Sequence, residues 1–256
     1  MISYEFPLNE RVRTLLRLED LHEKLEYFVA RRDGREPHAA IVTLFEILEV
    51  SGRADLKSEM MQELERQRQH LESLRSNPAI SAQALDKVLG DIDHANAGLF
   101  QSSGKTGQEL RENEWLMGIR QRIGIPGGVC EFDLPSYHYW LNLDADARRV
   151  DIAKWAAPFT PLKEGVRIVL RLLRESGKTG LASATQGLFQ QMMGGKLAQM
   201  LRVNVDSDYP CVPEVSANKY ALNIRFTQAQ GAERGRTYEG DVSFELTYCN
   251  LSSSNL

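Results

Sequence analysis

The pattern of apolar residues changes at residues 120–141, and this change constrains the fold more than any other feature of the chain. Before this segment, apolar residues recur every three or four positions, which is the period of an amphipathic helix. Most of the sequence from residue 180 onward alternates polar and apolar residues, as strands do. A Pro-Gly-Gly turn at residues 126–128 marks the change, directly after Arg120 and Arg122. We therefore expect a junction between two kinds of structure, with cations at a rigid corner.

The segment before the turn predicts a layer of helices. Their expected ranges are about 9–30, 37–51, 53–76, 81–98 and 106–122. Asn9, Ser81 and Thr106 are the expected N-caps of the first, fourth and fifth helices, and Thr106 with Glu109 has the form of a capping box. Two further helices, at 145–156 and from Thr160 to Gly177, are expected to pack back onto this layer.

The remaining segments have the pattern of strands. The expected ranges are 129–132, 137–143, 181–192, 199–205, 220–227 and 241–248. Turn residues separate the later strands at hairpin distances, which predicts an antiparallel sheet. The expected fold is therefore α+β. A helical domain (residues 1–124 and 145–176) precedes a β domain (residues 125–144 and 177–249), and residues 250–256 are expected to fray.

Composition excludes several classes of protein. The chain has 256 residues, of which 42% are apolar and 26% charged, as in globular proteins. It contains no apolar run of about 18 residues and no signal peptide, so we expect a cytoplasmic protein. Cys130, Cys211 and Cys249 are far apart and predict reduced thiols rather than a metal or redox site. The net charge of −4 argues against a surface devoted to nucleic acid.

Two sets of residues resemble catalytic motifs without meeting their requirements. Gly-Lys-Thr-Gly occurs at Gly104 and at Gly177, but the first glycine of a phosphate-binding loop is replaced by leucine in both cases. Asp133, Ser136 and His138 are the residue types of a hydrolase triad. Because neighbours on an extended segment point to alternating faces, they are not expected to converge. We assign no catalytic residue, no metal site and no cofactor.

The chemistry that remains is a set of cations at the ends of elements and on exposed faces. Arg120 and Arg122 end a helix beside the turn. In the strand around Arg225, the alternation places Arg225 with Asn223 on the solvent face, because Leu222, Ile224 and Phe226 take the other face. Guanidinium groups match carboxylates in a bidentate geometry, so these positions predict recognition of an acidic ligand. A nucleic-acid-binding module that uses the same arginines is the alternative.

Several of these segments resemble one family of proteins. The segments are Pro7–Glu10, Arg13-Thr14, Leu16–Glu19, Glu63–Gln67, Arg120–Arg122 with Ile125–Gly128, Phe132–Pro135, His138–Leu141, Asn223–Phe226 and Phe244–Leu246. Together they closely resemble the cell-division protein family ZapD, and the resemblance covers about residues 6–249. The central motif is long and irregular.

The resemblance implies a bacterial cytoplasmic protein at the division site that binds the C-terminal peptide of the tubulin-like protein FtsZ and cross-links its filaments. It also implies a homodimer held by the helical domain, with a positively charged surface for the acidic part of the FtsZ tail. It implies no enzyme activity. The cations that match are Arg17, Arg53, Lys57, Arg120, Arg122 and Arg225, together with His138.

Overall fold

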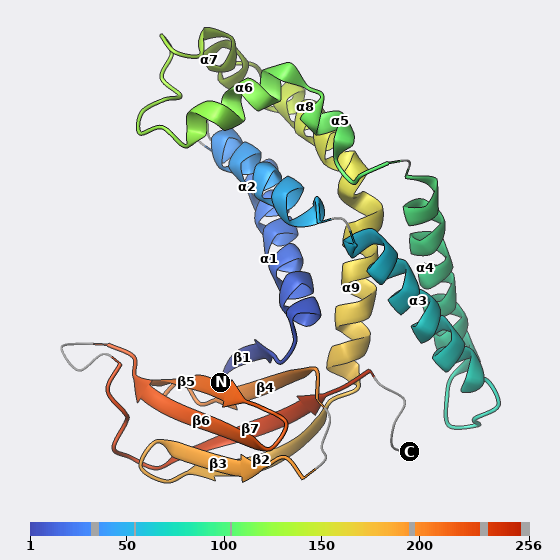
Figure 1. Cartoon of the computed structure of the whole chain (residues 1–256), viewed down its shortest axis with the longest axis vertical. Helices are drawn as coiled ribbons and strands as arrows, with labels where there is room; N and C mark the ends of the chain where they lie inside the picture. The colour runs from blue at the N-terminus through green and yellow to red at the C-terminus, as the bar shows by residue number, and fades with distance from the viewer. Residues whose placement is uncertain (32–35, 54, 103, 195–197, 231–234, 252–256) are drawn as a thin grey trace. The chain divides into compact units, whose positions relative to one another are not determined.

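The fold is α+β, with helices first and antiparallel sheets after them, and the chain divides into two compact units. The computed structural model describes residues 1–31, 36–53, 55–102, 104–194, 198–230 and 235–251 (Figure 1). We call residues Leu15–Val169 the helical unit. The β unit consists of Met1–Thr14 and Leu170–Leu256.

The first and the last helix each have residues in both units. The described helices are α1 (Glu10–Ala30), α2 (Glu36–Ser51), α3 (Leu56–Ser73), α4 (Ala82–Gln101), α5 (Gln108–Arg111), α6 (Glu114–Ile123), α7 (Pro135–Leu141), α8 (Ala145–Ala156), the 3-10 turn η1 (Ala157–Phe159) and α9 (Thr160–Glu175). The two mid-chain helices predicted from the sequence are α8 and α9, and both are confirmed.

The N-caps show where local sequence signals succeeded and where one failed. Asn9 Oδ1 accepts a hydrogen bond from the Val12 amide at 2.8 Å, and Ser81 Oγ accepts one from the Ala84 amide, as predicted. The predicted capping box at Thr106 is wrong. Gly107 occupies the N-cap position of the short α5, and Asn113 caps the separate helix α6. The single helix expected at 106–122 is therefore two helices.

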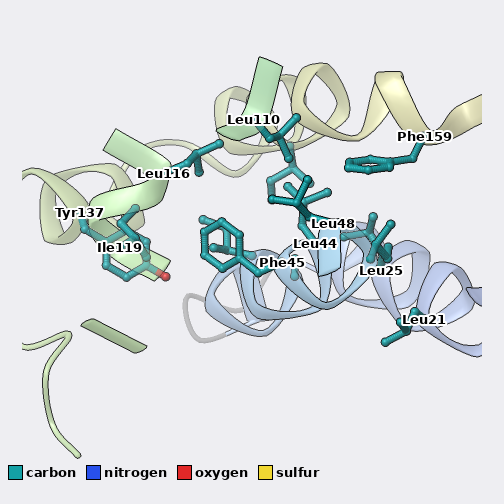
Figure 2. Close-up of a cluster of buried hydrophobic side chains, with 14 of the residues drawn as sticks. Leu21, Leu25, Leu44, Phe45, Leu48, Leu110, Leu116, Ile119, Tyr137 and Phe159 are labelled. Atoms are coloured by element: carbon teal, nitrogen blue, oxygen red, sulfur yellow. The ribbon is translucent and has the colours of Figure 1, made fainter. Parts of the chain in front are cut away.

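The core of the helical unit lies between α1, α2 and the helices that follow α4 (Figure 2). Leu44, Phe45 and Leu48 project from α2 toward Leu110, Leu116 and Ile119, with Leu21 and Leu25 of α1 alongside. Helix α9 contacts α1, α3 and α4. Its Lys163 forms an ion pair with Glu26 of α1. Gly165 lies against Met60 of α3, and Pro161 lies against Gly98 of α4. The predicted packing of α9 on the helical layer is therefore confirmed.

The described residues of the β unit form seven strands in two antiparallel sheets. They are β1 (Ile2–Pro7), β2 (Lys178–Ala184), β3 (Leu188–Met192), β4 (Met200–Val205), β5 (Cys211–Ala217), β6 (Ala221–Gln228) and β7 (Val242–Cys249). The orders are β1-β4-β7-β2 and β3-β6-β5. Their inner faces share one core, in which the rings of Phe226 and Phe244 lie 5.1 Å apart. Each sheet thus covers one face of the other.

Several strand predictions need correction. The single strand expected at 181–192 is the hairpin of β2 and β3, because Gln186 and Gly187 both take positive φ angles and form a two-residue turn. The sequence patterns also missed β1 and β5.

The prediction that the end of the chain frays is wrong for positions 250 and 251. The amides of Asn250 and Leu251 donate to Ser176 and Gln199, and Leu251 is buried. The rest of the predicted frayed end, residues 252–256, lies outside the described residues.

A polar network joins the first strand of the β unit to the end of α9. The carboxylate of Glu5 on β1 contacts Arg174 at 2.8 Å and Arg202 at 3.3 Å. Burial raises the pKa of Glu5, but these two guanidinium groups outweigh it and leave the pKa below its usual value. The N-terminal strand is thereby fixed to β4 by charge as well as by its ladder.

The strands predicted at 129–132 and 137–143 are wrong. The described chain has turns at 126–133 and the helix α7 at Pro135–Leu141, and both lie in the helical unit. Aromatic residues favour strands in general, which explains the prediction for Tyr-His-Tyr-Trp. Here Tyr137 and Trp140 are three residues apart and therefore face the same side of a helix, where both are buried.

Among the described residues, no helix combines the length and apolar character that a membrane span needs.

Candidate functional site

The predicted corner is a run of consecutive turns between α6 and α7. We call residues 124–134 the corner segment. The Gly128 amide donates to the Ile125 carbonyl at 2.8 Å, and the Asp133 and Leu134 amides both donate to the Cys130 carbonyl at 3.0 Å. Gly127 has a φ of 72°, and a side chain at Gly128 would lie 2.6 Å from the Arg122 carbonyl oxygen. Both glycines are therefore required by this geometry, which supports a rigid corner.

An aromatic cluster holds α7 in place on the far side of the corner. Tyr137 and Trp140 stack with their ring centroids 6.0 Å apart, and Trp115 of α6 and Trp155 of α8 each lie within 6.0 Å of Trp140. The hydroxyl of Tyr137 lies 2.8 Å from Nδ1 of His38 on α2. Because its inner face is fixed in this way, α7 presents its other residues to solvent from a defined position.

Arg120 and Arg122 both lie beside the corner, and each contacts a carboxylate of the chain. Nη2 of Arg120 is 2.5 Å from Glu49 of α2, and Nη1 of Arg122 is 3.5 Å from Asp133 at the end of the corner segment. These side chains are partly exposed, so each contact contributes about 0–1 kcal/mol. A carboxylate from a ligand can therefore replace either partner at small cost.

His138 lies close to the same segment. Its Nδ1 is 3.9 Å from Glu131, and Nδ2 of Asn142 is 3.4 Å from its Nε2. Ser136 accepts a hydrogen bond from the indole of Trp115 at 3.0 Å, and Asp133 faces Arg122. The three residue types that resemble a triad thus each contact a different partner. Arg122 contacts Asp133 and His138 contacts Glu131, and both of these carboxylates belong to the corner segment.

Three of the predicted cations lie elsewhere in the helical unit. Arg17 is exposed on α1, and Arg53 is exposed between α2 and α3. Lys57 of α3 donates to the carbonyl of Ser102, the C-cap of α4, so its ammonium group neutralises a helix C-terminus. Figure 1 shows α3 and α7 at separate places in this unit. Lys57 therefore has a structural contact of its own, whereas Arg120 and Arg122 contact the carboxylates of Glu49 and Asp133, which are exposed and partly exposed.

Arg225 belongs to the β unit and faces solvent on β6, as the alternation predicted. Its directly opposite neighbours are Leu188 on β3 and Glu214 on β5. The guanidinium contacts Glu214 at 2.6 Å, and both side chains are about half exposed. Arg225 therefore resembles the corner cations in having one weakly held carboxylate partner.

The sequence did not reveal which exposed apolar residues belong to the part of the chain that carries Arg120, Arg122 and His138. Ile125, Phe132 and Tyr139 are all exposed, and all three lie on or next to the corner segment. Their identity was visible in the motif, but an aromatic residue in a predicted strand is expected to be buried. Only the observed turns and the orientation of α7 show that they face solvent.

Comparison with known proteins assigns the family. Residues 16–225 match the family described as "ZapD: Cell division protein". The chain is 54% identical over 251 residues to a protein of Nitrosomonas europaea named "Cell division protein ZapD", which covers 98% of this chain and 96% of that protein. The chain belongs to the ZapD family of cell-division proteins. A ZapD of Azoarcus sp. is 55% identical over 251 residues, 98% of this chain and 100% of that protein.

The ZapD match includes most of the helical unit, part of the β unit and every cation proposed for the site. Its range begins just before Arg17 and ends at Arg225. The corner segment, α6 and α7 lie inside it. The resemblance inferred from the separate motifs is therefore confirmed at the level of the whole chain, and the ZapD assignment makes this a cell-division protein.

Proposed function

We propose that this protein binds the C-terminal peptide of FtsZ and cross-links FtsZ filaments at the division site, as a homodimer held by its helical unit and without catalysing a reaction. The family assignment over nearly the whole chain is the observation that carries this proposal. Partly exposed cations with weakly held carboxylate partners support it, because an acidic peptide supplies carboxylates in their place.

The proposed mechanism is bivalent binding. A two-fold dimer carries two identical peptide sites on one body, so it joins two filaments without further components. Each site can bind weakly, since many tails on one polymer raise the effective concentration for the second contact. In the helical unit, the residues proposed for the carboxylates of the tail are Arg120, Arg122 and His138 beside the corner segment. In the β unit, Arg225 is proposed for the same kind of contact. Arg17, Arg53 and Lys57 are the remaining cations proposed for the tail.

Co-sedimentation with FtsZ filaments tests this function directly. The protein is expected to pellet with FtsZ and to lose pelleting when the C-terminal peptide of FtsZ is deleted. Arg120→Glu and Arg225→Glu are each expected to weaken binding about tenfold, because a charge-assisted hydrogen bond contributes about 1.5–3 kcal/mol. Raising the ionic strength is expected to reduce bundling, since exposed charges are screened.

The control for these reversals is Lys87→Glu, which reverses an exposed cation on α4 that is not part of the proposed site. It changes the net charge by the same amount, so a specific site predicts pelleting like that of the unsubstituted protein. Analytical ultracentrifugation checks that the dimer persists. Unchanged pelleting of both Arg120→Glu and Arg225→Glu would show that the tail binds elsewhere.

The carboxylate partners of these cations are expected to compete with the ligand. Glu214→Gln frees Arg225 from its exposed partner. Since an exposed ion pair contributes up to about 1 kcal/mol, peptide affinity is expected to rise by up to about fivefold. Fluorescence anisotropy of a labelled FtsZ peptide measures this change. The matched control is Glu239→Gln, an exposed glutamate of the same unit, which removes the same charge. An equal rise in both variants would assign the effect to net charge alone.

A further inference from the structure

Phe132 is exposed to solvent although the chain around it is well fixed. Its side chain is 80% exposed, which is unusual for a large aromatic residue in a segment of consecutive hydrogen-bonded turns. A mobile loop would explain exposure without function. Here the Asp133 and Leu134 amides, directly after Phe132, both bond to the Cys130 carbonyl. The backbone therefore holds this ring away from the core.

The two neighbours of Phe132 connect it to the cations of the proposed site. Glu131 lies 3.9 Å from Nδ1 of His138, and Asp133 lies 3.5 Å from Arg122. Phe132 thus stands between two contacts that tie the corner segment to α7 and to α6. An apolar ring between two residues that each contact a cation is complementary to a peptide in which an apolar side chain stands next to carboxylates, because such a peptide can replace Glu131 or Asp133 as the partner of its cation.

Two more exposed apolar side chains belong to the same local structure. Tyr139 is exposed and directly follows His138, the residue that contacts Glu131. Ile125 is exposed at the start of the corner segment, where its amide bonds to the Arg122 carbonyl at 3.0 Å. Together these residues place apolar surface at both ends of the corner segment, beside the same cations.

We propose that Phe132, with Tyr139 and Ile125, binds the apolar side chains of the acidic peptide whose carboxylates contact Arg122 and His138. This inference rests on the proposed function, because it assigns a second kind of contact to the same ligand. Cations supply attraction and orientation, and they lose strength as salt rises. The buried aromatic contact supplies affinity that salt does not screen.

Fluorescence anisotropy of a labelled FtsZ C-terminal peptide tests the inference, with Phe132→Ala compared with Phe100→Ala. Phe100 on α4 is 79% exposed, so the control removes an equally exposed ring from another place. Phe132→Ala is expected to weaken binding about tenfold at both low and high salt, and Phe100→Ala to leave it unchanged. A peptide whose apolar residues are replaced by serine is expected to bind both the unsubstituted protein and Phe132→Ala equally weakly.

The outcomes separate this inference from the proposed function. If the unsubstituted protein binds the peptide and Phe132→Ala binds it equally well, the aromatic contact is refuted while the proposed function stands. If the unsubstituted protein does not bind the peptide, both fail. If Phe132→Ala dissociates the dimer in analytical ultracentrifugation, the ring belongs to an interface between two copies, and the inference is also overturned. Because the ring is exposed, circular dichroism is expected to show unchanged folding.

Discussion

Trp140→Ala is expected to lower the free energy of unfolding of the helical unit by about 3–5 kcal/mol, the usual cost of removing a buried tryptophan. Trp140 is 5% exposed and stacks on Tyr137, with Trp155 at 5.6 Å. Its indole also donates to Asp151 at 2.9 Å, so the substitution removes a hydrogen bond as well as packing. Because α7 has only seven residues, it has no stability apart from these contacts.

Urea unfolding followed by tryptophan fluorescence measures this effect. The three tryptophans of the chain are Trp115, Trp140 and Trp155, and all belong to the helical unit, so the signal reports on that unit. The control is Tyr139→Ala, which removes an exposed aromatic side chain from the same helix and is expected to change stability by less than about 0.5 kcal/mol.

Trp140→Ala is also expected to weaken peptide binding, because α7 positions His138, and His138 contacts Glu131 of the corner segment. Binding is measured under conditions in which the variant remains folded. An unfolding midpoint equal to that of the unsubstituted protein would show that the aromatic cluster does not hold α7. Loss of stability with full peptide affinity would instead place the ligand away from α7.

The long helices could be predicted from the sequence because their signals are local. α8 was predicted with both of its observed ends, and α1 ends at Ala30 as expected. Asn9 and Ser81 cap their helices through bonds to residues three positions later. Such bonds depend only on neighbouring residues and on the period of the apolar side chains. The fold class followed from the same periodicities.

The helix α7 could not be predicted because residues distant in the sequence stabilise it. Its seven residues are rich in aromatics, which alone favour a strand. Trp115 and Trp155, about 20 residues before and after its centre, decide the conformation by packing on Trp140.

Strand β5 was missed because its place in the sheet could not be predicted. Pro213 lies within it, and proline argues against a central strand, whereas β5 is at the edge of its sheet.

The candidate site was only partly accessible to sequence reasoning. The Pro-Gly-Gly turn and its two arginines were identified, since glycine and proline act locally. The carboxylates that contact Arg120 and Arg225 were not identified. Helix packing brings Glu49 to Arg120, and strand register brings Glu214 to Arg225. The exposure of Phe132 likewise depends on the turns of the corner segment. The sequence thus predicted the cations, and the structure shows the carboxylates that they contact and the exposed apolar residues of the corner segment.

Acidification is expected to destabilise the helical unit through His22 of α1. His22 is 6% exposed, and its buried Nε2 has no hydrogen-bond partner among the described residues. Burial and, to a smaller extent, the ammonium group of Lys163 lower the pKa of His22 to about 4, although the carboxylate of Glu26 acts in the opposite direction. His22 is therefore neutral in the folded protein at physiological pH.

The sign of the effect follows from the two protonation equilibria. The unfolded chain binds a proton at His22 near the ordinary histidine pKa, whereas the folded chain resists protonation until about pH 4. The unfolded state is thus favoured as the pH falls below about 6.5, and the free energy of unfolding is expected to drop by about 2 kcal/mol between about pH 8 and about pH 5. Burial also lowers the pKa of His38, which adds a further decrease of the same sign.

His22→Leu separates the two histidines, because leucine fills a similar volume and does not titrate. Urea unfolding at several pH values, followed by tryptophan fluorescence, is expected to show that this variant loses most of the pH dependence and keeps the part due to His38. The control is His94→Leu, which removes a histidine that is exposed on α4 and is expected to retain the full dependence. If His22→Leu unfolds with the same pH dependence as the unsubstituted protein, His22 is already solvated in the native state. The packing of α1 against α9 would then be looser than the Glu26–Lys163 pair implies.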